Sequence, residues 1–143
     1  MSISADVKRA HVGRLKAGGD LAEEVGRFLD RHGVRFGVVS IIGALAKAKL
    51  GSYHFGERVY KTFDIDHESE ILHCTGNIST LDGKTFAHLH ATLSGEDGRA
   101  FGGHVFPGCA IHVAECVVLE FAGEPPVRQD DPQTGLKLWP AES

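Results

Sequence analysis

The sequence has few cysteines, and their arrangement offers little for disulfide chemistry. Cys74, Cys109 and Cys116 are odd in number and contain no CxxC pair of the kind that thiolate zinc sites use. A disulfide framework and a thiolate zinc site are therefore both disfavoured, and a reducing compartment fits this composition best. We expect a cytoplasmic protein.

Long apolar runs and basic clusters are also missing. The longest apolar stretch, residues 37–46, is interrupted by Ser40 and is too short to cross a bilayer, and the N-terminus has no apolar signal-peptide core. No three consecutive Lys or Arg residues occur, and 15 Lys+Arg against 19 Asp+Glu give a net charge of −4. Such a chain gains little from neutralising phosphates, so membrane insertion and non-specific nucleic-acid binding are both disfavoured.

What is present first is the material for one helix. The 143 residues suffice for a single domain with its own core. Asp20 followed by Glu23 resembles a capping box, and Gly33 suits the left-handed end of a helix. Apolar residues recur between them at helical spacing: Leu21, Val25, Phe28 and Leu29. The pattern predicts one main amphipathic helix over about residues 20–32.

The remainder of the chain, with many of its 18 glycines, reads as strands and turns. Asp82-Gly83, residues 96–98 and Pro107-Gly108 mark turns between apolar, alternating segments. The predicted strands are residues 12–15, 34–45 (with a bend or bulge at Gly37 or Gly43), 46–55, 58–65, 70–79, 85–93, 99–106 and 109–123. We predict an α+β fold, a mostly antiparallel sheet packed by one helix, with residues 1–122 as the compact core and 123–143 as a surface-crossing tail.

Three histidines stand out within these strands. His88 and His90 are two residues apart, so both rings leave one face of a strand about 6–7 Å apart at their bases. If residues 96–98 form a hairpin, His104 lies on the neighbouring strand and can reach the pair. Gly102-Gly103 would then leave room for the three rings and an ion. Three neutral imidazoles suit zinc first and other divalent transition metals, such as nickel, copper or iron, second.

Other interpretations of the same residues stay open. An HxH pair on a half-exposed strand also occurs without any metal, and His112 is expected to be a core or surface residue. Glu115 and Glu120 face opposite sides of their strand, so at most one can orient an imidazole of the site. Cys109 is expected to be a buried residue at a strand start rather than a nucleophile. A three-histidine site leaves a position for water, whose pKa can fall to about 7, so a metal-dependent hydrolase or lyase is an alternative.

The order of these motifs resembles a known family. A cupin shares the HxH pattern, but the glutamate expected soon after it is replaced by residues 92–95, Thr-Leu-Ser-Gly. Over residues 12–138 the chain is similar instead to the plant and prokaryote conserved domain, called PPC or PCC. The matching residues are Arg14-Leu15, Ile42-Gly43-Ala44-Leu45, Leu50-Gly51-Ser52-Tyr53, Glu70-Ile71-Leu72, Gly76-Asn77-Ile78, Asp82-Gly83, His88-Leu89-His90-Ala91, Asp97-Gly98, Gly102-Gly103-His104, Glu115, Arg128, Asp131 and Thr134-Gly135-Leu136.

The resemblance implies a compact α+β fold, a homotrimer, and a metal site, most often zinc, at His88, His90 and His104. It also implies a link to DNA, because plant members carry the domain behind AT-hooks. This chain has no RGRP-like AT-hook core, and its acidic balance independently disfavours DNA binding. We therefore expect a homotrimeric metal-binding domain with a binding or regulatory role and a small-molecule ligand at the metal. A DNA-binding, transcription-related protein is the second alternative beside the metalloenzyme.

Overall fold

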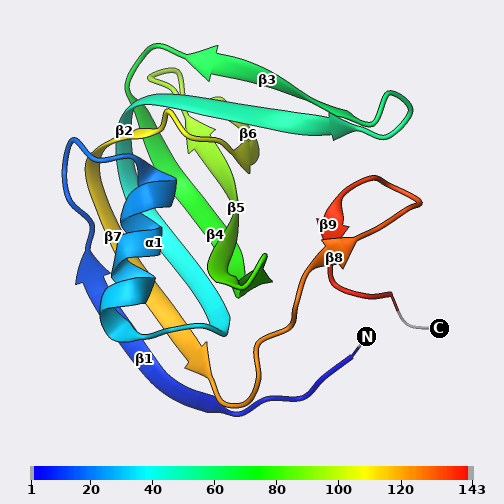
Figure 1. Cartoon of the computed structure of the whole chain (residues 1–143). Coiled ribbons are helices and arrows are strands. Elements are labelled where there is room, and N and C mark those ends of the chain that lie inside the picture. The colour runs from blue at the N-terminus through cyan, green and yellow to red at the C-terminus, as the bar shows by residue number, and fades with distance from the viewer. Residues whose placement is uncertain (1, 142–143) are drawn as a thin grey trace.

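The computed structural model describes residues 2–141, with one helix and a set of antiparallel strands (Figure 1). In chain order the elements are β1 Val7–Arg14, α1 Leu21–His32, β2 Gly37–His54, β3 Val59–Ile65, β4 Ser69–Leu81, β5 Lys84–Ser94, β6 Ala100–Val105, β7 Ala110–Phe121, β8 Gln129–Asp130 and β9 Lys137–Leu138. The predicted α+β class, a mostly antiparallel sheet with one helix, is confirmed.

Helix α1 begins and ends where the sequence predicts. Asp20 is the N-cap, and its Oδ1 accepts hydrogen bonds from the backbone amides of Ala22 and Glu23. Gly33 ends the helix in the left-handed conformation, with φ of 66°. The other carboxylate oxygen of Asp20 accepts from the backbone amides of Gly108 and Cys109. One side chain therefore caps the helix and ties it to the start of β7.

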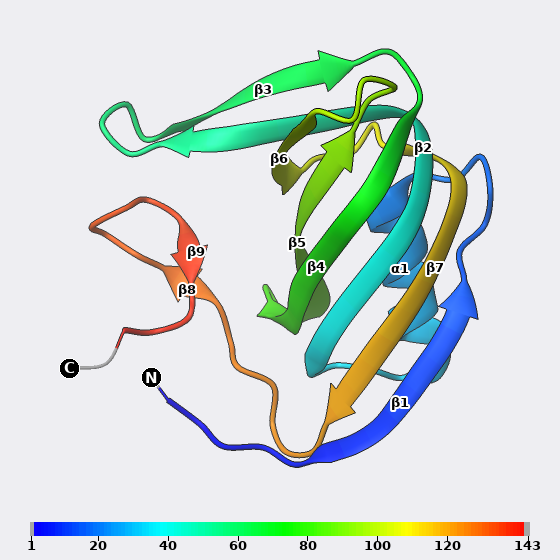
Figure 2. The same cartoon turned by 180° about the vertical axis from the view of Figure 1, so that it is seen from behind.

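The strands form one seven-stranded sheet in the order β1-β7-β2-β4-β5-β6, with β3 paired to β2. The sheet curls so far that β6 also pairs with β2, through Leu50 with Val105 and Gly51 with His104. Helix α1 covers one face of the sheet, whereas the outer face of β1, β7 and β2 has no described element over it (Figure 2). The core lies between α1 and the inward-facing side chains of the curled sheet.

Strand β2 differs from the prediction, since residues 34–45 and 46–55 were expected as two strands. They form one strand of 18 residues, because its first half pairs with β4 and β7 and its second half with β3 and β6. The expected bulge is present: the register with β4 shifts between Ile41 and Gly43. The second half of β2 and β3 together form an arm, residues 48–65, which we call the β2–β3 arm (Figure 1).

The tail, residues 123–141, runs back alongside β4 and ends in the β8–β9 hairpin. It is tied to β4 by two backbone hydrogen bonds, from Thr80 to Pro126 and from Arg128 to Thr80. The hydroxyl of Tyr53 on the β2–β3 arm donates to the carbonyl of Thr134 at 2.6 Å.

Helix α1 has 12 residues, and no helix of residues 2–141 is long and apolar enough to span a membrane.

Candidate metal centre

Strands β5 and β6 bring the three predicted histidines together. In the antiparallel register between these strands, His90 lies opposite His104, and His88 is two residues before His90 on the same face. Leu89, which points the other way, is buried in the core, as the alternation predicts. The hairpin turn that follows β5 therefore aligns a third ring with the HxH pair.

The donor nitrogens converge on one point. His88 Nε2 lies 3.0 Å from His104 Nδ1 and 3.2 Å from His90 Nε2. One donor atom from each ring lies within 4.8 Å of the others. Two nitrogens bound tetrahedrally at 2.0–2.1 Å from one ion would be separated by about 3.3 Å. The three imidazoles therefore fit a single transition-metal ion with only small shifts of the rings.

Burial keeps two of these rings neutral. The pKa of His88 is lowered to about 4, mainly by burial and then by His104, Arg128 and His90. The pKa of His104 is also lowered to about 4, mainly by burial and then by His90 and Arg128. Both rings are consequently unprotonated at neutral pH, which is the state that offers a lone pair to a metal.

These lowered pKa values predict how the metal-free protein responds to pH. Between about pH 6.5 and pH 4 the unfolded chain binds protons at His88 and His104 that the folded chain excludes, so stability falls as pH falls through this window. Urea unfolding with a chelator present measures the free energy of unfolding at each pH in this window. Its slope against pH should be shallower in His104→Gln, whereas the exposed control His112→Gln should keep the slope of the unchanged protein. An unchanged slope in His104→Gln would contradict the lowered pKa of His104.

The two glycines before His104 have a different role from the one predicted. A Cβ on Gly102 would lie 2.4 Å from the carbonyl oxygen of Ala91, and one on Gly103 would lie 2.6 Å from that of Gly51. Real Cβ atoms do not approach backbone this closely. The glycines therefore permit β6 to lie between β5 and β2, rather than making room for the rings.

Sequence reasoning missed two neighbours of the cluster. The ring of Tyr60, on β3, lies 5.0 Å from the ring of His104. Arg128, on the tail, places Nη2 3.4 Å from Nδ1 of His88. Arg128 was among the residues that resembled the family, but no pattern in the sequence placed it beside the histidines. Tyr60 gave no signal of its own.

The other residues considered for the site lie elsewhere. Glu120 Oε1 accepts one hydrogen bond from Lys8 Nζ, and Glu120 Oε2 lies 3.0 Å from His11 Nε2. Glu115 lines a separate hollow on the outer face of the sheet. The sequence allowed at most one of these two glutamates to support the cluster, and in the structure neither of them does. His112 lies at the surface, 2.9 Å from a carboxylate oxygen of Glu68.

The cysteines are buried and free, as expected of a core without disulfides. All three are buried, and no disulfide joins them. Burial raises the pKa of the Cys109 thiol, and the side chain is 0% exposed, so Cys109 is a core residue rather than a nucleophile. The chemistry that the structure offers is therefore centred on the histidines.

A curled antiparallel sheet, one capped helix and a three-histidine cluster define a small α+β domain with a candidate metal centre. Residues 2–122 match the Plants and Prokaryotes Conserved (PCC) domain. The chain belongs to this family, as its motifs predicted.

Several solved structures share the fold. A metal-containing protein from Archaeoglobus fulgidus is 36% identical, with a TM-score of 0.92 over 99% of this chain and 100% of that one. A plant- and prokaryote-conserved (PPC) protein from Pyrococcus horikoshii is 28% identical, with a TM-score of 0.93 over 100% and 99%. The bifunctional protein GlmU of Synechococcus sp. (strain JA-3-3Ab) is 35% identical over 124 residues, 85% of this chain. The chain spans only 19% of that relative's length.

Proposed function

We propose that this domain binds one divalent transition metal, zinc first, through His88 Nε2, His90 Nε2 and His104 Nδ1, in a binding or regulatory role. The observation that carries the proposal is the convergence of the three nitrogens, with separations of 3.0 and 3.2 Å. Neutral rings at His88 and His104 support it, and so does the name of the Archaeoglobus fulgidus relative, a metal-containing protein.

Metal binding would affect Arg128 and the aromatic neighbours of the cluster differently: Arg128 would lose a contact, whereas the aromatic rings would hold His104 in place. A neutral imidazole that binds a metal through Nε2 carries its proton on Nδ1. His88 would therefore have its proton on the nitrogen that faces Arg128, and the Arg128 guanidinium would lose an acceptor there. Tyr60 and Phe106 flank His104, with ring centroids 5.0 and 4.9 Å away, and restrict its rotation.

Metal analysis tests this proposal. Protein made without an affinity tag is stripped with a chelator, exposed to zinc, and dialysed against metal-free buffer. We expect about one retained ion per chain, because residues 2–141 contain one such set of three donors. His112→Gln, which changes a surface histidine, should retain the same amount. Zinc-free protein after this treatment would remove the central premise.

We also propose that the chain assembles as a homotrimer. Three apolar side chains line one hollow on the outer face of the sheet and are unusually exposed: Val12 at 76%, Ile42 at 55% and Val117 at 42%. Contact between copies would remove this surface from water. Light scattering should give three times the 15.4-kDa chain mass, and a stable monomer at micromolar concentration would contradict it.

A metal-dependent hydrolase or lyase is the second candidate, because His88 and His104 also line a hollow that could admit a substrate. A zinc ion bound there would supply Lewis-acid chemistry. Chelator-sensitive turnover of ester, amide or small cyclic substrates tests this use of the site. Turnover that persists unchanged in His88→Ala would reject it.

A further inference from the structure

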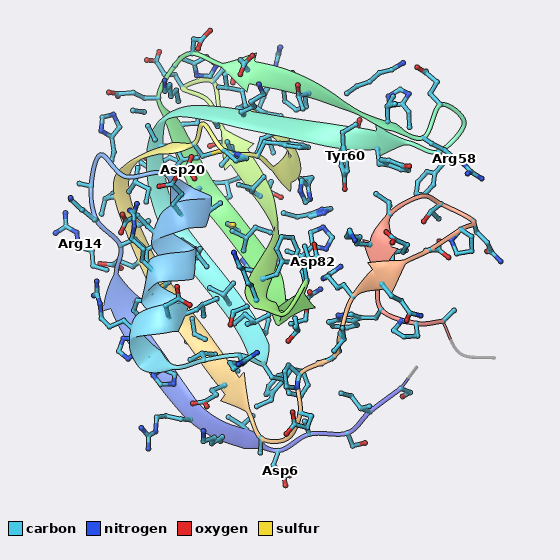
Figure 3. All side chains as sticks on the ribbon, viewed as in Figure 1. Asp6, Arg14, Asp20, Arg58, Tyr60 and Asp82 are labelled. Atoms are coloured by element: carbon cyan, nitrogen blue, oxygen red, sulfur yellow. The ribbon has the colours of Figure 1, made fainter. Side chains whose placement is uncertain are left out.

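A small hollow adjoins the histidine cluster on the side of the tail. Its volume is about 190 Å³, and its lining includes Tyr60, Phe86, His88, His104, Arg128 and Leu136. Three parts of the chain enclose it: the β2–β3 arm, the sheet, and the tail. Tyr60 projects from the arm toward the tail (Figure 3). Most of the wall is aromatic or aliphatic, and its two charged residues are Arg128 and Lys137. The Lys137 ammonium already has carboxylate partners in Asp82 and Asp130, at 3.4 and 3.3 Å, which leaves Arg128 as the cation without one.

Arg128 is a buried cation that has only neutral partners. The residue is 7% exposed. Its Nε donates to Ser79 Oγ at 3.1 Å, its Nη1 to the Lys137 carbonyl at 3.0 Å, and its Nη2 to Asn77 Oδ1 at 2.6 Å. Among residues 2–141 no carboxylate forms a salt bridge with this guanidinium. A buried charge without a counter-ion is costly, and an anionic ligand would relieve that cost.

The guanidinium also has hydrogen-bonding capacity to spare. It carries five N–H groups, of which Ser79, Lys137 and Asn77 occupy three. The contact from Nη2 to His88 Nδ1, at 3.4 Å, uses a fourth, and one N–H on Nη1 has no partner among the described residues. A metal on His88 Nε2 would place a proton on Nδ1 and end the fourth contact. Two donors would then be free for a ligand in the hollow.

We propose that this hollow binds a small carboxylate with a short apolar body, whose carboxylate faces Arg128 and the metal from the hollow that both border. The inference rests on the proposed function, since the metal is the second anchor. Neutral imidazoles bring no negative charge, so a divalent ion beside the guanidinium concentrates three positive charges in a half-buried site. A planar guanidinium pairs well with a carboxylate. The aromatic and aliphatic walls favour an apolar body over a strongly hydrated phosphate dianion.

Butyrate is a suitable probe, and the chain supplies its own reporter. Trp139 is the only tryptophan, and its ring lies 5.6 Å from the Arg128 guanidinium. We expect butyrate to change the fluorescence of zinc-loaded protein saturably. Butyramide, which has the same shape without the charge, should bind at least about tenfold more weakly, because a hydrogen bond between charged groups is stronger than one with a neutral partner. Inorganic phosphate should also bind at least about tenfold more weakly, because the apolar walls do not replace its lost hydration. Equal binding of butyramide or tighter binding of phosphate would overturn the assigned ligand class.

Matched variants separate recognition from a structural role of Arg128. Arg128→Gln should weaken butyrate binding about tenfold or more and leave the retained zinc unchanged. Arg128→Lys, which keeps the charge, should lose less and serves as the test variant if Arg128→Gln does not fold. Arg99→Gln is the control, because the Arg99 side chain is 89% exposed and outside the hollow. Butyrate binding that is the same in the Arg128 variants and in Arg99→Gln would overturn the proposal.

The two proposals fail in distinguishable ways. If zinc is retained but butyrate leaves the fluorescence unchanged, the metal site stands and the carboxylate site is wrong. If zinc is not retained, the butyrate titration on metal-free protein tests the carboxylate site by itself, because Arg128 remains buried without a counter-ion. Binding that depends on Arg128 would then support the carboxylate site alone, and absence of binding would reject both.

Discussion

Replacing His104 by glutamine should lower the affinity for zinc at least about 100-fold. His104 supplies the one donor from β6, opposite His90, and without it only the HxH pair of β5 remains. A glutamine amide is a poor zinc ligand. Loss of a supporting residue around a metal ligand already costs about 10–100-fold, so loss of a ligand should cost more.

Competition with a chromophoric chelator measures this loss. His112→Gln is the matched control, because it removes an imidazole from β7 that lies beside Glu68 and away from the cluster. Its zinc affinity should equal that of the unchanged protein. Thermal unfolding of both variants verifies that the fold persists. A His104→Gln protein that binds zinc as tightly as the control would show that the ion, if bound, is held elsewhere.

Gly103→Ala should lower both the free energy of unfolding and the affinity for zinc. The added Cβ would lie 2.6 Å from the carbonyl oxygen and 3.2 Å from the nitrogen of Gly51. Both of these atoms belong to the backbone of β2, so they cannot move aside as a flexible side chain would. Overpacking of this kind costs about 1–3 kcal/mol. Because His104 is the next residue, moving β6 away from β2 also displaces one of the three nitrogens. Urea unfolding and the chelator competition measure the two effects.

Gly26→Ala is the matched control for this substitution. Gly26 lies within α1, and a Cβ there would meet nothing within 4 Å. Alanine is the better helix former, so the control should be more stable by about 0.5–1 kcal/mol and bind zinc unchanged. If Gly103→Ala behaves like Gly26→Ala in both measurements, the close approach of β6 to β2 does not position the site.

The features that could be predicted from sequence depend on local patterns. The capping pair of Asp20 and Gly33 defined the helix, because the groups that end a helix lie within a few residues of it. The alternation of His88 and His90 with Leu89 placed both rings on the outer face. The turn before β6 then brought His104 opposite His90. Each step uses chain neighbours or one hairpin.

The features that escaped prediction depend on distant partners. Strand β2 appeared as two strands because its halves pair with different neighbours, which only the curled sheet brings together. The clash that keeps residue 103 a glycine comes from Gly51, more than fifty residues away. Arg128 reaches His88 because the tail returns along β4, and composition alone could place that tail no more closely than on the surface.

Anomalous diffraction from zinc-soaked crystals tests the central claim most directly. We expect a peak at about 2.0–2.1 Å from His88 Nε2, His90 Nε2 and His104 Nδ1 together. Rings that turn away from one another, or a zinc peak bound only to other side chains, would contradict it.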